Sequence, residues 1–178
     1  GFGTSVMAAF TAAVKIEAFI YMPAQEYANA FSTFIAQNMG AGQTVRIKRG
    51  IRYAVLTVFS YCAAASALLW FLARPLTLIF IDEEEAHIVA EGVKYLRTVG
   101  PFYWGIGCLF LLYGLYRALG KPSMSVVLTV ISLGTRVVLA YTLSPLSGVG
   151  VDGIWWAIPI GWVLADSAGI LYYALSFR

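Results

Sequence analysis

Polar and charged side chains interrupt a long apolar stretch over residues 15–42, and they are the first candidates for chemistry. Glu26 falls near the middle of this stretch, where an ionised carboxylate in a bilayer costs about 2.5 to 3.5 kcal/mol. Acids in such places usually face a bundle interior or a water-filled cavity. At about 100° per residue, a helix puts four polar residues on one side: Glu26, Asn29, Thr33 and Gln37. The sequence therefore predicts a membrane helix with a functional polar stripe.

Glu17 is a second acid in the same stretch. It precedes Glu26 by nine positions, so a straight helix would point the two carboxyl groups to opposite sides. Pro23 removes a backbone hydrogen bond between them and is expected to kink the helix, which leaves their relative angle open. A structural interpretation is also open, with Lys15 and Glu17 in the outer headgroup region and Glu26 neutral and hydrogen-bonded to a neighbouring helix. Both acids are candidate ion- or substrate-binding residues.

Three more candidates lie inside other apolar segments. Asp166 lies beside a stripe of small residues, where interhelical hydrogen bonding and a functional role are equally open. Arg136 can extend its charge to the membrane surface, so a structural role and a substrate contact both remain possible. Tyr113 offers an aromatic ring to a cation. These residues extend the candidate site beyond the first segment.

The other reactive residues do not support enzyme chemistry. His87 is the only histidine, and Cys62 and Cys108 lie in apolar runs, where a thiol behaves as a small hydrophobic group. The acidic run over residues 82–85 is consecutive, whereas a calcium loop spaces its ligands. No carboxylates pair at a workable spacing. We therefore expect a protein that is not an enzyme and has no metal site or bound cofactor.

The composition places these residues in a lipid bilayer. Hydrophobic residues make up 60% of the 178 residues and charged residues 12%, and the mean hydropathy is +0.78. An average soluble domain has roughly 25% charged residues. We therefore expect an all-α, multi-pass protein of the cell membrane, plasma or inner, with no nucleic-acid partner.

Five apolar segments are long enough to cross a bilayer. They cover residues 5–39, 53–73, 99–119, 124–143 and 154–177. A short interfacial helix is predicted over residues 86–100, because Glu91, Lys94 and Arg97 recur every three residues opposite an apolar face. The last segment repeats small residues at every fourth position, a pattern typical of close helix packing: Gly153, Ala157, Gly161, Ala165 and Gly169. Residues 1–178 are expected to form a single transmembrane bundle.

Basic residues gather at alternate connections between these segments. The densest run is RIKRGIR over residues 46–52, and Arg117 and Lys121 follow the third segment. By the positive-inside rule these connections are cytoplasmic, and the acidic run over residues 82–85 is outside. Five spans then place residue 1 outside, which suggests a preceding helix in a longer protein.

Several strings resemble the C-terminal lobe of the MATE family of multidrug and toxin extrusion transporters. They are IEAFIYMPAQEYANAFSTFIAQNMGAG, RIKRGIR, YLR, GLYRALGKP and GVDGIWWAIPIGW, and they cover nearly all of the chain. The most specific pieces are QN-x-GAG at residues 37–42, R-x-x-G at 117–120 and G-x-x-G-I-W at 150–155. The resemblance implies a transporter of two six-helix lobes facing each other as a V. This chain would supply five of the six helices of the second lobe and would work with the missing N-terminal lobe.

The resemblance also implies a mechanism, in which two lobes rock around a central site. Small organic cations would be exported in exchange for protons or sodium ions. Glu26, aided by Asn29 and Gln37, would present an anionic wall to the cation, and protonation of Glu26 from outside would favour release. Aromatic rings would add cation–π contacts: Tyr27, Phe31 and Tyr113. The segment over residues 99–119 lacks the acid that family members carry there, which leaves the coupling site open.

Two other functions remain as alternatives. A flippase for lipid-linked substrates of the same superfamily would need basic residues to hold phosphates, and the spans offer mainly Arg136 and Lys15. A noncatalytic membrane scaffold would not need polar groups in the middle of its spans. The acids Glu17, Glu26 and Asp166 therefore favour cationic cargo.

Overall fold

The computed structural model describes residues 3–146 and 148–176, and it confirms the predicted all-helical bundle. Within these residues the chain forms six α-helices and no strand: α1 (Gly3–Gly40), α2 (Thr44–Thr77), α3 (Ala86–Val99), α4 (Tyr103–Ala118), α5 (Pro122–Leu143) and α6 (Gly150–Ser176). A 3-10 turn, η1 (Gly100–Phe102), joins α3 to α4. Five stretches of the described chain are long and apolar enough to cross a membrane, with α3 through α4 counting as one.

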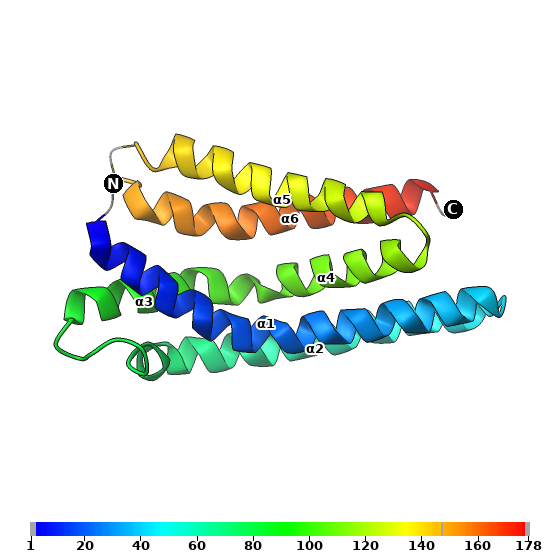
Figure 1. Cartoon of the computed structure of the whole chain (residues 1–178), viewed down its shortest axis with the longest axis horizontal. Coiled ribbons are helices and arrows are strands. Elements are labelled where there is room, and N and C mark those ends of the chain that lie inside the picture. The colour runs from blue at the N-terminus through cyan, green and yellow to red at the C-terminus, as the bar shows by residue number, and fades with distance from the viewer. Residues whose placement is uncertain (1–2, 147, 177–178) are drawn as a thin grey trace.

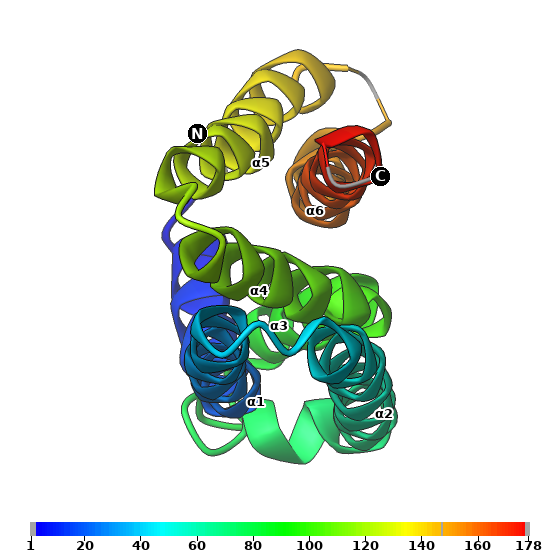
Figure 2. The ribbon, with the colours of Figure 1, turned by 90° about the vertical axis from the view of Figure 1, so that its right-hand side faces the viewer.

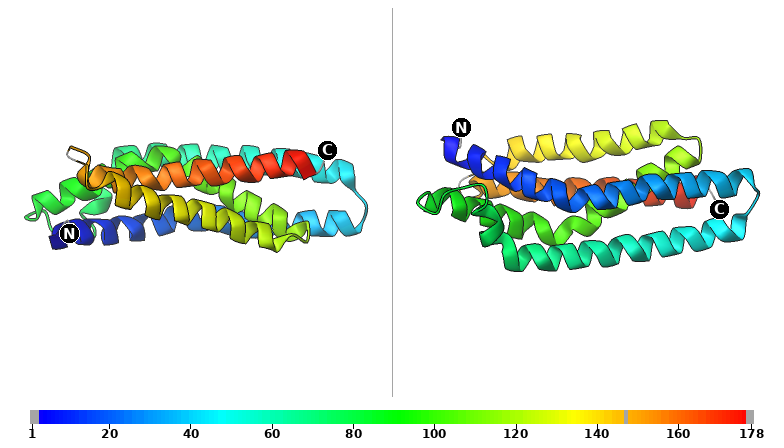
Figure 3. Two further views of the ribbon diagram at one scale, coloured as in Figure 1. Left: turned by 90° about the horizontal axis from the view of Figure 1, so that it is seen from above. Right: turned by 60° about the horizontal axis from the view of Figure 1, so that its bottom comes forward.

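The helices lie along one long axis (Figure 1). Helix α4 is central and contacts α1, α2, α5 and α6. Figure 2 shows α1 and α2 on one side of α4, and α5 and α6 on the other. Two further views place the α1–α2 and α4–α5 connections at one end of the bundle and the α2–α3 connection at the other (Figure 3). The two basic connections therefore share one end, as the predicted topology requires.

Two turns at this basic end have the same geometry. Gly42 and Gly120 have φ angles of +66° and +69°, which glycine adopts without steric cost. In each turn, the residue after the glycine donates its backbone N–H to the carbonyl oxygen five residues earlier. Gln43 N donates to Asn38 O at 2.8 Å, and Lys121 N donates to Tyr116 O at 2.9 Å. This pattern satisfies the last carbonyls of α1 and α4 and ends both helices. QN-x-GAG and R-x-x-G therefore set the ends of these two helices.

Several helix boundaries differ from the predictions. Helix α2 begins at Thr44 rather than at residue 53, so the basic run RIKRGIR is helical. Lysine and arginine are good helix formers, and only three residues separate α1 from α2. Helix α6 begins at Gly150 rather than at residue 154, and the predicted last residue of that segment, 177, lies outside the described residues. The short helix predicted over residues 86–100 is present as α3, and it continues through η1 into α4 as one stretch of membrane-crossing length. Its place at the membrane interface stays a prediction.

The five small residues of the α6 stripe are all buried and let neighbouring helices approach closely. A Cβ atom built on Gly161 would lie 2.6 Å from the backbone oxygen of Ser132 in α5. A Cβ on Gly169 would lie 2.7 Å from Leu112 Cδ1 in α4. Both distances are shorter than real Cβ contacts, and the backbone oxygen of Ser132 cannot move aside as the Leu112 methyl can. The predicted packing stripe is therefore confirmed, and it packs α6 against α4 and α5.

Candidate functional site

A cavity of about 430 Å³ opens among α1, α3, α4, α5 and α6. One stripe of α1 supplies much of its wall, because five of its residues recur at intervals of three or four: Phe10, Val14, Glu17, Tyr21 and Gln25. Tyr95, Tyr103, Phe110, Arg136 and Trp162 contribute from the other helices. The wall is thus largely aromatic and carries one acid and one guanidinium.

Glu17 is the acid of this cavity, and it is 8% exposed. The Tyr95 hydroxyl donates to Glu17 Oε2 at 2.9 Å, and the Tyr103 hydroxyl donates to Glu17 Oε1 at 2.9 Å. The two tyrosines stand on either side of η1, so one carboxyl group ties α1 to both α3 and α4. Hydrogen bonds of this kind to a charged group contribute about 1.5 to 3 kcal/mol each. Glu17 is therefore held rigidly at the cavity wall.

Arg136 is the guanidinium of the cavity. Its Cζ lies 5.3 Å from the centre of the Trp162 ring, and its Nη2 donates to Ser132 Oγ at 3.2 Å. Arg136 Nε and Trp162 Nε1 are buried donors without a partner in the part of the chain that the structure describes. Arg136 therefore points into the bundle instead of toward the membrane surface, and both donors are available to a bound molecule or to water.

The polar stripe that the sequence predicts lies on another face of α1. Glu26 is exposed and accepts a hydrogen bond from Asn29 Nδ2 at 3.3 Å. Asn29 Oδ1 in turn accepts from Arg117 Nη2 of α4 at 3.1 Å, and Gln37 is exposed near the end of α1. The structure thus brings Glu26 and Asn29 together but separates them from Glu17. Their role in binding stays a prediction.

The aromatic residues expected beside Glu26 do not line the cavity of Glu17. Phe31 is a core residue, 7% exposed, and lies 3.5 Å from the position that a Cβ of Gly114 would occupy. Tyr113 is half-buried and its hydroxyl accepts from Thr129 Oγ1 at 3.0 Å. Tyr27 is exposed. The cavity takes its aromatic surface from other positions.

Sequence reasoning missed those positions. Tyr21 follows Glu17 by four residues, so helical spacing alone could have placed the two side by side. Tyr95 and Tyr103 are 78 and 86 residues from Glu17 in sequence, and no spacing rule connects them to it. Only the fold brings these hydroxyls to the acid.

Asp166 is buried at 4% exposure and lies at the contact between α6 and α4. Its Oδ2 lies 3.7 Å from the position that a Cβ of Gly105 would occupy. Neither carboxyl oxygen has a hydrogen-bond partner among the described residues. The Cys108 thiol of α4 lies beside this carboxyl group and is the described group that suits an interhelical hydrogen bond, so both roles of Asp166 stay predictions.

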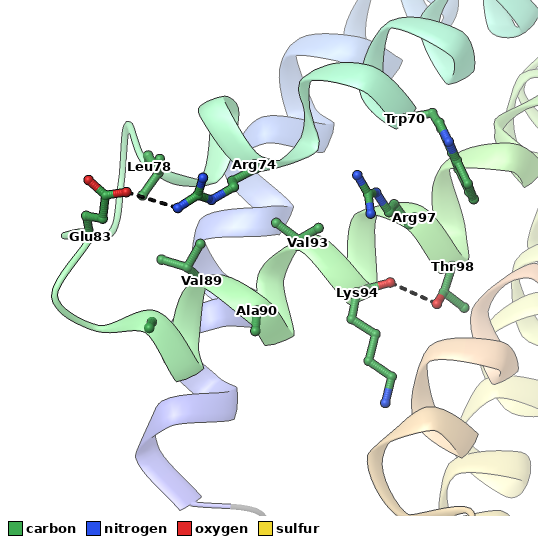
Figure 4. A pocket seen from close by; sticks show the side chains of 11 residues that line it. Trp70, Arg74, Leu78, Glu83, Val89, Ala90, Val93, Lys94, Arg97 and Thr98 are labelled. Carbon is green, nitrogen blue, oxygen red and sulfur yellow. Dashed lines mark hydrogen bonds and ion pairs between the residues drawn. The ribbon is translucent and has the colours of Figure 1, made fainter.

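A second cavity, of about 630 Å³, lies between the end of α2 and α3 (Figure 4). Arg74 Nη2 donates to Glu83 Oε1 at 2.9 Å, and Arg97 Cζ lies 5.6 Å from the centre of the Trp70 ring. Lys94 extends away from both arginines and pairs with Asp152 of α6 at 2.5 Å. Since its charged groups already have partners within the chain, we place the candidate site at the cavity of Glu17.

Comparisons with known proteins agree with this architecture. The family model MatE matches residues 1–142. The probable multidrug resistance protein YpnP of Bacillus subtilis is 31% identical over 174 residues, which are 97% of this chain and 38% of that protein. The FAD transporter of Shewanella oneidensis is 29% identical over 98% of this chain and 37% of its own length.

Solved structures show the same fold. A multidrug resistance MATE family transporter of the MOP superfamily, in an outward-facing conformation, aligns with a TM-score of 0.90 at 22% identity. The alignment covers 97% of this chain and 39% of that one. A MATE in the bent conformation aligns with a TM-score of 0.87 at 22% identity, over 97% of this chain and 38% of that one.

The chain therefore spans less than two fifths of these proteins, which corresponds to one lobe. The resemblance of its motifs to the MATE family is confirmed by the family model and by the relatives. The chain belongs to the MatE family, whose members are membrane transporters and not enzymes.

Proposed function

We propose that the full-length protein is a secondary active transporter of the cell membrane that exports cationic, drug-like compounds by proton- or sodium-coupled antiport. One observation carries this proposal: a buried acid, Glu17, on the wall of an aromatic cavity within membrane-length helices. Intramembrane acids usually mark ion or substrate pathways. The name of the YpnP relative, a probable multidrug resistance protein, supports the cargo class.

The geometry supports exchange at a single carboxyl group. Tyr95 and Tyr103 each donate to one oxygen of Glu17, and a carboxylate can accept both bonds. A proton on either oxygen would turn that oxygen into a donor and weaken the hydrogen bond that it accepts from its tyrosine. An organic cation would instead approach the ionised carboxylate and the rings of Tyr21 and Phe110. The proton and the cation thus require different states of Glu17, which is the basis of antiport.

The remaining lobe would complete the site. In alternating access, two lobes rock about a site between them. The polar residues Glu26, Asn29 and Gln37 of α1, of which Asn29 is half-buried and the other two are exposed, would then face the remaining lobe and form a second contact surface for cargo. Glu17 and Glu26 therefore make separable contributions.

Glu17→Gln in the full-length protein tests the proposal. We expect this variant to lose efflux of a fluorescent organic cation from proteoliposomes driven by a proton or sodium gradient, while it still folds. Glu26→Gln is the matched comparison on the same helix. Coupled efflux that survives Glu17→Gln but not Glu26→Gln would move the site from the cavity to the exposed stripe of α1. Efflux unaffected by either change would refute the proposal.

Arg136 favours a second candidate, an anionic cargo that includes phosphate-bearing, lipid-linked compounds. Arg136 Nε and Trp162 Nε1, two donors without a partner in the described ranges, both lie at the cavity and suit an acceptor group. A relative named as an FAD transporter fits this class. Arg136→Gln separates the candidates: it would abolish export of an anionic fluorophore if the cargo is anionic, and would leave export of a cation intact if the cargo is cationic.

A further inference from the structure

Asp166 occupies a closed seam between α4 and α6 that no part of the proposed exchange at Glu17 uses. It follows Trp162 by one helical turn and faces α4 where Gly105 allows close approach. A Cβ on Gly105 would lie 3.2 Å from Trp162 Cβ and 3.7 Å from Asp166 Oδ2. The carboxyl group is thus enclosed between two helices at 4% exposure, and among the described residues the Cys108 thiol of α4 is its hydrogen-bonding neighbour.

An isolated carboxylate is unfavourable in such a place. Moving an ionised group out of water without a partner costs several kcal/mol, and the group takes up a proton instead. A metal ion would need several ligands. No group of three or more histidine, cysteine or acidic side chains that could hold one gathers anywhere in the described chain. A proton is therefore the ligand that suits this carboxyl group.

The groups around Asp166 come from each helix packed against α6. Helix α4 presents the Cys108 thiol beside the carboxyl group, and the Tyr113 hydroxyl within electrostatic reach of it. Helix α5 presents Arg136, whose side chain packs against Gly161, five residues before Asp166. Helix α3 directs Lys94 to Asp152, at the far start of α6. Among the described residues, Asp166 therefore has polar neighbours that can pass a proton but none that neutralises its charge as an ion pair.

Neighbours of Asp166 line two different cavities. Trp162 and Arg136 belong to the cavity of Glu17. Tyr113 lines a separate cavity of about 360 Å³ between α4 and α5, together with Ser125 and Thr129. The hydroxyl groups connect there, because Thr129 Oγ1 lies 3.0 Å from the Tyr113 hydroxyl and 2.9 Å from the Ser125 carbonyl oxygen. This cavity lies toward the Pro122 end of α5, which the positive-inside rule assigns to the cytoplasm.

We propose that Asp166 is a proton-exchange site, separate from Glu17, that opens to the Tyr113 cavity. In the closed seam the group is a carboxylic acid. When α4 and α6 separate, the acid gives its proton to water in the Tyr113 cavity and becomes a carboxylate, and the reverse step reloads it. This inference deepens the proposed antiport, since it places a second exchangeable proton in the same lobe.

Infrared difference spectroscopy on the full-length protein in lipid vesicles tests the inference directly. We expect a carbonyl stretch of a protonated carboxylic acid that disappears as the pH is raised and shifts in deuterated water. Asp166→Asn should remove this band, Asp166→Glu should move it, and Glu17→Gln should leave it in place. Tyr113→Phe should slow its exchange with deuterium. If Asp166→Asn does not fold, the shifted band of Asp166→Glu identifies the group by itself.

Two results would overturn the inference. A spectrum in which Asp166→Asn and Asp166→Glu remove or shift no band means that Asp166 carries no proton. A band that belongs to Asp166 but neither titrates nor exchanges means a fixed structural acid. The proposed function fails separately: if the band titrates while efflux ignores the proton gradient, the proton site stands and the coupling does not.

Discussion

Tyr103→Phe gives a quantitative test of the Glu17 site, because it removes one donor and nothing else. Glu17 Oε1 would be left buried and without its partner at 2.9 Å. A hydrogen bond to a charged group contributes about 1.5 to 3 kcal/mol, whereas one between neutral groups contributes about 0.5 to 1.5 kcal/mol. Tyr103→Phe should therefore lower the free energy of unfolding of the wild-type protein by about 1.5 to 3 kcal/mol. In the Glu17→Gln background the same change should lower it by about 1 kcal/mol less.

The assay is denaturant unfolding of the four full-length proteins in mixed micelles, combined as a double-mutant cycle. Tyr61→Phe is a matched control, since the Tyr61 hydroxyl donates to a neutral α1 carbonyl, Ile20 O, at 2.7 Å. Its cost should add to that of Glu17→Gln. If the effects of Tyr103→Phe and Glu17→Gln also add, within about 0.3 to 0.5 kcal/mol, the two side chains do not interact as a charged pair and the reasoning fails.

Three further changes test the packing and the surface charges, each followed by the thermal unfolding of the full-length protein. Gly114→Ala should lower the free energy of unfolding by about 1 to 3 kcal/mol, because the new Cβ would lie 2.6 Å from a backbone oxygen of α1. An unchanged unfolding midpoint would mean that α1 and α4 are further apart than described. Gly42→Ala should lower the free energy of unfolding by about 1 to 2 kcal/mol, because the φ of +66° at this position strains any residue other than glycine. An unchanged stability would contradict the described turn between α1 and α2. Lys94→Ala should lower the free energy of unfolding by less than about 1 kcal/mol, and by less still in high salt, because the ion pair with Asp152 is half-exposed. A large loss that does not depend on salt would show that the pair is buried.

The elements of this fold follow from local rules, and so the sequence predicts them. Apolar length gives the spans, the spacing of Glu91, Lys94 and Arg97 gives the amphipathic α3, and glycines 42 and 120 give the turns. The starts of α2 and α6 are less predictable, because a helix that leaves the bilayer needs no apolar pattern. Its extension into water depends on helix propensity and on the length of the turn before it.

The centre of the site could not be predicted in the same way. Helix α1 carries acids on two faces, Glu17 and Glu26, and both acids lie within one long apolar stretch. Which face turns inward depends on where α3, α4 and α5 pack, and that information lies in residues at least 78 positions away. The sequence therefore identifies both acids as candidates, and the packing assigns the cavity to Glu17.

The tryptophans of this lobe fall into two environments, and this division gives the cavity an optical signal of its own. Trp155 and Trp162 are 2% and 6% exposed, whereas Trp70, Trp104 and Trp156 are between 37% and 47% exposed on the outside of the bundle. Brominated lipids would quench the outer fluorophores and spare the inner pair. The residual emission should then report a molecule that enters beside Trp162, and Trp162→Phe should silence that report. Cargo binding thus becomes measurable by fluorescence without a label on either the protein or the cargo.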